Sequence, residues 1–359
     1  MHTKTFVAAA VGLGLISLSA CGSSSSGSEG SGGSKNITLV SHDSWAVSKK
    51  VLADFEKQSG YKVRVLKDGD AGQAVNKAIL TKDNPQGDVF FGVDNTLLSR
   101  ALDNGLFQSY EPKGADRIQA QYRVDQARHR VTPIDSGDIC VNYDKAYFSK
   151  HRLTPPASFD DLVKPEYKNL LVTENASTSS PGLGFLLGTA AKYGDAGWQG
   201  YWKKLKANGV KVVDGWEQAY NEEFSGSAGG KKAKGDRPLV VSYASSPPAE
   251  VIYGDPKPKT ALTGTSYGTC FRQIEYAGLL SNAKNSKGGK AFLDFLVTKE
   301  FQEDMPLNMF VYPVREGAQV PPEFVKYGQP AKDPETMAPT RIAANRDQWV
   351  KSWTSLVLK

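Results

Sequence analysis

Acidic and aromatic side chains occur together directly after several predicted strands of this 359-residue chain. Asp43, Asp68 and Asp94 each follow a short β-rich run, so a parallel sheet would bring the three carboxylates to one edge. Carboxylates beside aromatic faces suit a flat cationic ligand held by stacking and cation–π contact. The alternatives are ordinary caps and turns for the acids and core positions for the aromatic residues. The aromatic residues in these loops are Trp45, Trp216, Tyr243, Phe310 and Tyr312.

Two polar segments in the middle of the chain could also contact a ligand. Ser179 and Ser180 stand before Pro181 and an apolar run, which predicts the start of a helix. The free N–H groups of a helix start can hold a phosphate or another polar group, although most caps bind only their own helix. Further along, a predicted strand at 239–243 runs into a Ser/Pro-rich loop.

No set of residues has the spacing of a catalytic or metal site. His42, Asp43 and Ser44 are adjacent, and successive side chains at a strand end diverge, so they do not form a triad. The chain has neither a G-x-S-x-G nor an H-E-x-x-H motif, and the lysine-rich stretch 225–237 departs from the phosphate-loop pattern. We therefore predict a binding protein that is not an enzyme and has no metal or cofactor.

The amino terminus has the pattern of a secretory lipoprotein signal. Lys4 precedes an apolar run over 6–18, which is too short to span a membrane and ends in Leu18-Ser19-Ala20-Cys21. A Cys in this position resembles the bacterial lipobox; the alternative is a generic signal with an accidental Cys. We expect residues 1–20 to be removed, Cys21 to be lipidated, and the Ser/Gly-rich segment 21–35 to tether the protein to the outer face of the cytoplasmic membrane.

The charge balance and the cysteine content of the chain further restrict the class of protein to which it could belong. The 44 basic and 38 acidic residues give a net charge of only +6, which argues weakly against a nucleic-acid binder.

Cys140 and Cys270 remain once Cys21 is assigned to lipid. In an oxidising compartment two such thiols form either a disulfide or two separate buried thiols. A bridge would close a loop of about 130 residues, worth ~4–5 kcal/mol in the chain-entropy description.

Strand and helix patterns alternate along the first third of the chain. We predict strands at 36–41, 61–66 and 89–91, with helices between them, the first ending at Gly60. Asp94 or Asn95 is expected to cap a third helix that ends at Gly105. A second set of elements begins near a strand at 139–143. This order predicts an α/β fold with a largely parallel sheet.

The order of motifs resembles the thiamine-binding proteins of bacterial ABC importers over nearly all of the mature chain. The segments that carry the resemblance are Lys67-Asp68-Gly69, Gly92-Val93-Asp94-Asn95, Ser179-Ser180-Pro181-Gly182, Gly215-Trp216, Ser242-Tyr243-x-x-Ser246-Pro247, Tyr312-Pro313-Val314 and Gln348-Trp349-x-x-x-Trp353.

That resemblance implies a two-lobed periplasmic-binding-protein type II fold with hinge crossover strands. Lobe 1 would comprise 36–137 plus 262–316, and lobe 2 would comprise 138–261 plus 317–359. Cys140 and Cys270 would lie just past the two crossover strands, which run side by side, and this favours the disulfide. Closure about the hinge would bury the ligand between the lobes.

The resemblance also implies a set of ligand-binding residues. Asp68 and the aromatic faces would counter the thiazolium charge, Trp216 and Tyr243 would bracket the ring planes, and Ser179 and Ser180 would take the hydroxyethyl or phosphate end. Phe310 stands where the family tends to have Trp, and His42 where it has Tyr. The full expected set is His42, Asp68, Gly69, Ser179, Ser180, Trp216, Tyr243, Ala244, Ser245, Ser246 and Phe310.

The expected function is capture of thiamine, or its phosphates, by a membrane-anchored monomer that delivers it to an ABC permease. Another small ligand on the same scaffold, such as a polyamine, a phosphonate or ferric ion, is the first alternative. Ferric ion would call for anionic oxygen ligands such as paired tyrosines, and the sequence has no adjacent pair. An extracytoplasmic enzyme is the second alternative, and it lacks a recognisable nucleophile–base pair.

Overall fold

The computed structural model describes residues 34–227 and 235–359. The predicted signal peptide, the predicted lipidation site Cys21 and almost all of the predicted tether lie outside the described residues. The middle of the lysine-rich stretch 225–237 lies outside them as well. Within the described part of the chain, none of the helices combines the length and the apolar character needed to cross a membrane.

Ten strands of the described residues form one mixed sheet, in the order β2-β1-β3-β9-β5-β8-β6-β7, with β10 beside β5 and β4 beside β9. The β2-β1-β3 group and the β8-β6-β7 group are each parallel, and the pairings of β9 with β3 and of β5 with β8 are antiparallel. The strands are β1 (Asn36–Ser41), β2 (Lys62–Lys67), β3 (Val89–Asp94), β4 (Phe107–Gln108), β5 (Thr132–Asp144), β6 (Leu171–Glu174), β7 (Lys211–Val213), β8 (Leu239–Tyr243), β9 (Thr263–Leu280) and β10 (Tyr312–Pro313).

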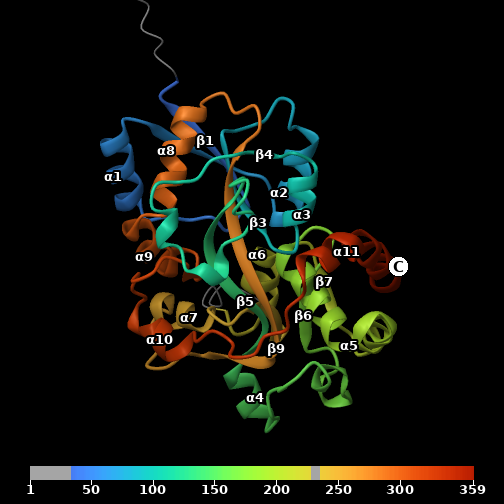
Figure 1. The fold of residues 1–359 in the computed structure, drawn as a ribbon. Helices are drawn as coiled ribbons and strands as arrows, with labels where there is room; N and C mark the ends of the chain where they lie inside the picture. Colours follow the sequence, from blue (N-terminus) through green and yellow to red (C-terminus); the bar gives the residue numbers. More distant parts are fainter. Residues whose placement is uncertain (1–33, 228–234) are drawn as a thin grey trace, which may run out of the picture. The chain divides into compact units, whose positions relative to one another are not determined.

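The helices connect and cover these strands, so the α/β class expected from the sequence is confirmed (Figure 1). They are α1 (Lys49–Ser59), α2 (Ala71–Leu80), α3 (Leu98–Asp103), α4 (Lys145–His151), α5 (Ser180–Ala207), α6 (Trp216–Gln218), α7 (Pro247–Tyr253), α8 (Ser286–Leu296), α9 (Lys299–Asn308), α10 (Pro322–Tyr327) and α11 (Pro339–Trp353).

Most of the predicted boundaries agree with the structure. Gly60 ends α1 in the left-handed conformation at φ 72°, and its N–H donates to the carbonyl of Glu56. The prediction that Asp94 or Asn95 caps a helix is wrong. Asp94 is the last residue of β3, and α3 begins only at Leu98, with no side-chain cap.

Two long strands join the two ends of the sheet. β5 and β9 pair with each other from Thr132 opposite Ala277 to Asp144 opposite Thr263. At one end β9 pairs with β3, and at the other end β5 pairs with β8, so these strands are the crossover that the resemblance implied. Figure 1 shows β9 as one continuous ribbon between the region of β1 and β3 and the region of α4.

A disulfide between Cys140 and Cys270 ties β5 to β9, which confirms the predicted bridge. Both cysteines are buried, and Ala244 and Ala331 pack against them in one small apolar cluster. Ala244 directly follows β8. The bridge therefore lies beneath the loop that connects β8 to α7.

The carboxyl-terminal helix α11 packs on both α5 and α3. Trp353 meets Trp202 of α5 edge to face, with ring centroids 5.4 Å apart, an arrangement worth about 0.5–1.5 kcal/mol beyond the apolar area it buries. On the other side, Arg100 of α3 pairs with Asp347 at 3.5 Å. The lobe boundaries proposed from the sequence remain a prediction.

Removing the disulfide is expected to lower the free energy of unfolding by about 2–5 kcal/mol, because the bridge closes a long loop in the unfolded chain. The measurement is denaturant unfolding of the Cys140→Ala/Cys270→Ala double variant. Each single alanine variant should lose at least as much, since it breaks the same bond and leaves a free thiol. A double variant as stable as the wild type would contradict the expectation.

Candidate functional site

A cavity of about 240 Å³ lies where the loops after β1, β2, β6, β7 and β8 meet. Its lining comes from both ends of the strand order, since β2 and β7 are the two outermost strands. Ligands of open α/β sheets bind outside the carboxyl ends of strands, and this cavity has that position. The residues that matter for the chemistry are His42, Asp43, Ser44, Asp70, Ser180, Trp216, Glu217, Tyr243, Ser246, Glu275 and Phe310.

The structure brings part of the expected ligand set to this cavity. The members that line it are His42, Ser180, Trp216, Tyr243, Ser246 and Phe310. The others lie beside the lining rather than in it. The carboxylate of Asp68 accepts a hydrogen bond from Lys77 Nζ at 2.5 Å, and the Asp68 side chain is only 3% exposed. Gly69 donates its N–H to Asp43 at 3.2 Å.

Three more members of the expected set are buried behind the cavity wall. Ser179 is buried and donates its hydroxyl to Asp70 at 3.1 Å. Ala244 and Ser245 have no exposed surface, and Ala244 packs on the disulfide. The loops were therefore placed correctly, whereas these individual residues do not line the cavity.

Asp70 is the central residue that sequence reasoning missed. Its Oδ1 accepts from Ala71 N at 2.6 Å and from Ser180 N at 3.3 Å. Its Oδ2 accepts from the Ser179 hydroxyl at 3.1 Å and from Trp216 N at 2.9 Å. Asp70 also caps α2 in a capping box with Gln73, and the D-x-x-Q spacing is the signal that could have identified it.

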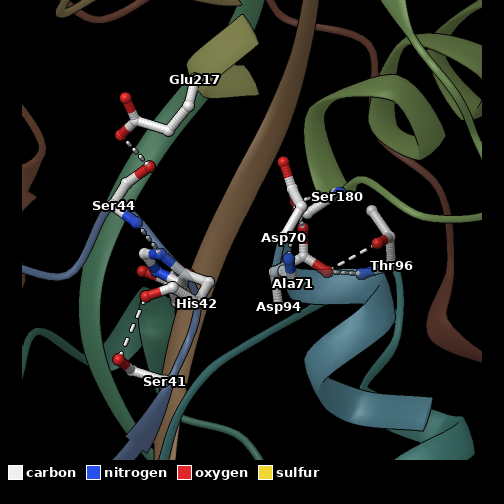
Figure 2. A network of polar contacts seen from close by, with 10 residues as sticks. Ser41, His42, Ser44, Asp70, Ala71, Asp94, Thr96, Ser180 and Glu217 are labelled. Carbon is white, nitrogen blue, oxygen red and sulfur yellow. Dashed lines mark hydrogen bonds and ion pairs between the residues drawn. The ribbon is translucent and has the colours of Figure 1, made fainter. Parts of the chain in front are cut away.

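The carboxylate of Asp70 therefore joins segments that are far apart in the sheet. It follows β2, whereas Ser179 and Ser180 follow β6 and Trp216 follows β7. Figure 2 shows Asp70 and Ser180 together at the first turn of α2. Burial raises the pKa of Asp70, and the hydrogen bond from Trp216 N is the largest effect that opposes this rise.

A second carboxylate contact runs between the same two regions. Asp94, which is fully buried at the end of β3, accepts a hydrogen bond from the hydroxyl of Ser180. Thr96 donates to the same carboxylate through its hydroxyl at 2.5 Å and its N–H at 3.0 Å. Burial raises the pKa of Asp94, and the hydrogen bonds from the Ser180 hydroxyl, the Thr96 hydroxyl and the Thr96 N–H act against that rise.

On the opposite side of the view in Figure 2, the Ser44 hydroxyl donates to the carboxylate of Glu217 at 2.9 Å.

Aromatic rings form one wall of the cavity. The Trp216 indole stacks on Tyr220 at 5.0 Å with an interplanar angle of 17°, and its centroid lies 6.4 Å from that of Tyr243. The indole N–H donates to the Ser242 hydroxyl at 2.9 Å, which fixes the ring orientation. Below it, the Tyr220 hydroxyl donates to the buried Glu250 at 2.6 Å. Stacking on Tyr220 and the hydrogen bond to Ser242 thus fix the Trp216 indole in the cavity wall.

Phe310 occupies the cavity edge with unusual backbone geometry. Its φ is 56°, in the left-handed region that costs a non-glycine residue about 1–2 kcal/mol. Its ring stacks on Phe324 at 6.0 Å and meets Tyr253 edge to face at 5.6 Å. These contacts hold the ring between α7 and α10.

His42 lies at the end of β1 in a cluster of buried ionisable groups. Its Nε2 is 3.1 Å from Glu275, and its Nδ1 accepts from Ser44 N at 3.2 Å, so the neutral ring donates to the carboxylate. Burial lowers the pKa of His42. The ring fits because residue 92 is glycine: a Cβ there would lie 2.3 Å from His42 Cδ2.

Glu275 shares this cluster with Asp135. Asp135 is fully buried directly opposite Glu275 in the pairing of β5 with β9, and neither of its oxygens has a hydrogen-bond partner among the described residues. Burial, followed by the charge of Glu275, raises the pKa of Asp135 well above its ordinary range. Burial also raises the pKa of Glu275 to about 8.

The electrostatic character of the cavity follows from this inventory. The acidic residues Asp43, Asp70, Asp214, Glu217 and Glu275 line it, and among the described residues its lining contains neither Lys nor Arg. Aromatic faces together with carboxylates suit a flat cation. In the described ranges, there is no group of three or more His, Cys, Asp or Glu side chains placed to hold a metal ion.

Comparison with known proteins gives the class and then the family. Residues 84–246 match the profile of the bacterial extracellular solute-binding proteins. The thiamine-binding periplasmic protein of Salmonella typhimurium is 30% identical over 326 residues, which cover 89% of this chain and 93% of that protein. The protein of the same name from Escherichia coli has the same identity and coverage. A solved structure titled periplasmic thiamin binding protein matches with a TM-score of 0.77 and 27% identity, over 90% of this chain and 96% of that one.

The chain belongs to the bacterial extracellular solute-binding proteins, and within them to the family of the thiamine-binding periplasmic proteins. The periplasmic-binding-protein type II fold expected from the sequence is thereby confirmed.

The His42–Glu275–Asp135 cluster predicts a pH dependence of stability. A carboxyl whose pKa is raised on folding is protonated in the folded state over a pH range where it is ionised in the unfolded chain. Stability is therefore lost as pH rises towards the folded pKa. His42, whose pKa is lowered, acts in the opposite sense only below its unfolded value of about 6.5. From pH 6.5 to 8 the wild type should lose about 1–2 kcal/mol through Glu275.

The measurement is denaturant unfolding at several pH values in that window for the wild type and for Glu275→Gln, whose amide cannot ionise. The variant should show a smaller loss. Glu217→Gln, which removes an acid from the exposed rim of the same cavity, is the control. Identical slopes for wild type and Glu275→Gln would show that Glu275 does not titrate as described.

Proposed function

We propose that this chain is the substrate-binding component of a bacterial ABC importer, capturing thiamine or one of its phosphates outside the cytoplasmic membrane and delivering it to a permease. The relatives named as thiamine-binding proteins support the choice of ligand. The observation that carries the proposal is the cavity itself, which sets the faces of Trp216 and Tyr243 beside carboxylates.

Thiamine has two flat rings, and its thiazolium ring carries a permanent positive charge. Stacking on Trp216 and Tyr243 would hold the ring planes, and His42 and Phe310 would contribute aromatic edges at opposite sides of the cavity. The carboxylate of Asp70 would balance the thiazolium charge in place of Asp68, which is paired with Lys77, and Asp43 and Glu217 would add negative charge to the same cavity.

Transport by this mechanism needs a change between open and closed forms. We propose that lobe 1, 36–137 plus 262–316, and lobe 2, 138–261 plus 317–359, close about the β5–β9 crossover. The closed form would dock on the permease. Lipidation at Cys21 would keep a monomer at the outer face of the membrane, and the segment 21–35 would give it freedom to reach the permease.

The cavity is proposed to bind its ligand without converting it. Candidate ligands of other chemistry are a polyamine, a phosphonate or ferric ion. Incubation of the purified protein with thiamine should return the vitamin unchanged by chromatography, and a new product would instead indicate an enzyme.

Thiamine is expected to raise the melting temperature, because a ligand that binds only the folded state stabilises it by mass action. Thermal shift with thiamine, its phosphates, spermidine, a phosphonate and ferric ion at equal concentrations is the test, with isothermal titration calorimetry on any ligand that stabilises. A shift with spermidine or ferric ion and none with thiamine or its phosphates would refute the proposal.

Trp216→Ala should weaken thiamine binding by about 1–3 kcal/mol, since it removes a stacking face. Trp216→Phe, which keeps a smaller face, should lose less. Tyr267→Ala is the control, because Tyr267 is 44% exposed and lies outside the cavity lining. Calorimetry is the measurement, and equal affinities for the wild type and Trp216→Ala would remove Trp216 from the site.

A further inference from the structure

Tyr220 and Glu250 form a buried pair directly behind the aromatic wall of the cavity. Trp216 lines the cavity, whereas Tyr220, which stacks on it with ring centroids 5.0 Å apart, does not. The Tyr220 hydroxyl donates to Oε1 of Glu250 at 2.6 Å, and Glu250 has no exposed surface. From the cavity inward, the order is therefore an indole, a phenol and a carboxyl group.

The helix that carries Glu250, α7, is connected to Trp216 at a second point. Ser246, which directly precedes α7, shares a hydrogen bond of 2.9 Å with the Ser242 hydroxyl, and that hydroxyl accepts from the indole N–H at 2.9 Å. The helix thus holds the edge of the indole through Ser246 and its stacking partner through Glu250. All of these residues belong to the proposed lobe 2, so the arrangement does not depend on whether the lobes are open or closed.

A carboxyl group is a costly choice for this buried position. The Tyr220 ring packs in an apolar cluster that also contains Val172, Val213 and Phe224. Oε2 of Glu250 is buried and has no hydrogen-bond partner among the described residues. Leaving a buried polar atom without a partner is destabilising, and an amide could accept from the Tyr220 hydroxyl equally well. The property that only the carboxyl group adds is a negative charge when it ionises.

Within the described part of the chain, Tyr220 is the titratable group that acts on Glu250. Burial raises the pKa of Glu250 to about 7, and the hydrogen bond from Tyr220 acts against that rise. On the elements packed against this pair, the other charged and titratable side chains are exposed or engaged with another side chain. They are Glu222, Glu223, Tyr267, Arg272, Glu323, Lys326 and Tyr327.

From this arrangement we propose that Glu250 is a positioning residue of the cation site: it holds Tyr220 against Trp216, and its ionised carboxylate strengthens the attraction of the stacked rings for a bound cation. The proposal rests on the proposed function, since it assumes that thiamine lies on Trp216. A phenol that donates to a carboxylate becomes richer in electrons, and the charge acts through an apolar cluster, where electrostatic interactions are stronger than in water. Reciprocally, a cation on Trp216 favours loss of the proton from Glu250.

The expected consequence is a thiamine affinity that depends on pH partly through Glu250. This group is neutral well below pH 7 and ionised well above it, so its contribution to binding grows from about pH 5.5 to about pH 8.5. Glu275 of the cavity also titrates in this range, near pH 8. The quantity to compare is therefore the dissociation constant of a variant divided by that of the wild type at each pH, because the effect of Glu275 is present in both.

The test is calorimetry with thiamine across this pH range on the full chain and on Glu250→Gln. Glutamine keeps an acceptor for the Tyr220 hydroxyl but cannot ionise, so a purely structural role of Glu250 would give the same ratio at every pH. We expect the ratio to rise on the order of tenfold from the acidic to the alkaline end. This is the effect of one unit charge about 12 Å from the cation at an effective dielectric constant of about 20.

Tyr220→Phe provides a second, independent variant. It keeps the ring that stacks on Trp216 but removes the hydrogen bond to Glu250. Because that bond lowers the pKa of Glu250, the rise in affinity should move to higher pH in this variant. An affinity profile with the same midpoint as that of the wild type would contradict the proposal.

The matched control is Glu222→Gln, which removes an exposed acid from the π-helical turn Ala219–Glu223 that carries Tyr220. Salt and water screen an exposed charge, so its ratio should stay close to one at every pH. A constant ratio for Glu250→Gln, or an equal rise for Glu222→Gln, would overturn the inference and leave the proposed function standing. Failure of the wild type to bind thiamine at any pH would overturn the proposed function itself.

Discussion

A half-buried carboxylate, Asp70, which accepts hydrogen bonds from three chain segments, is the interaction on which the site depends. Leaving a desolvated charge without partners costs several kcal/mol, and in this structure the starts of α5 and α6 both donate to Asp70. Those helices follow β6 and β7, at the far end of the sheet from β2, which precedes Asp70. The hydrogen bonds of one side chain thereby fix the relative positions of loops that no strand pairing connects directly.

The sheet explains why those loops meet at all. The paired strands β5 and β9 lie in the middle of the sheet, with the parallel group β2-β1-β3 on one side and the parallel group β8-β6-β7 on the other. The carboxyl ends of β1 and β2 therefore face those of β6, β7 and β8. The disulfide joins this pair close to the residue after β8, where Tyr243 and Ser246 enter the cavity. Gly92 in β3 gives the His42 ring the space to reach Glu275. Backbone and covalent features far from any ligand contact thus set the geometry of the cavity.

The sequence predicted loops better than it predicted side-chain directions. Strand–helix alternation and the motif resemblance were sufficient for the α/β class, the crossover and the segments around Ser180, Trp216 and Tyr243. They selected Asp68 rather than Asp70, because the direction of a carboxylate in that loop depends on the turn at Gly69, whose φ is 86°. The Asp135–Glu275 pair has no local signal, since the two residues meet only through the pairing of β5 with β9. Asp94 resembled a cap for the same reason: its true partner, Ser180, is distant in sequence.

The distribution of the six tryptophans gives the protein a built-in optical probe. All six lie in the described part of the chain, and Trp45, Trp198, Trp202, Trp349 and Trp353 are each no more than 5% exposed. Trp216 alone combines partial exposure with a place in the cavity wall. Emission from the buried indoles forms a constant background, whereas quenching or a wavelength shift on filling the cavity would arise from one known ring. Occupancy can therefore be followed in the unlabelled protein by fluorescence, without attaching a dye.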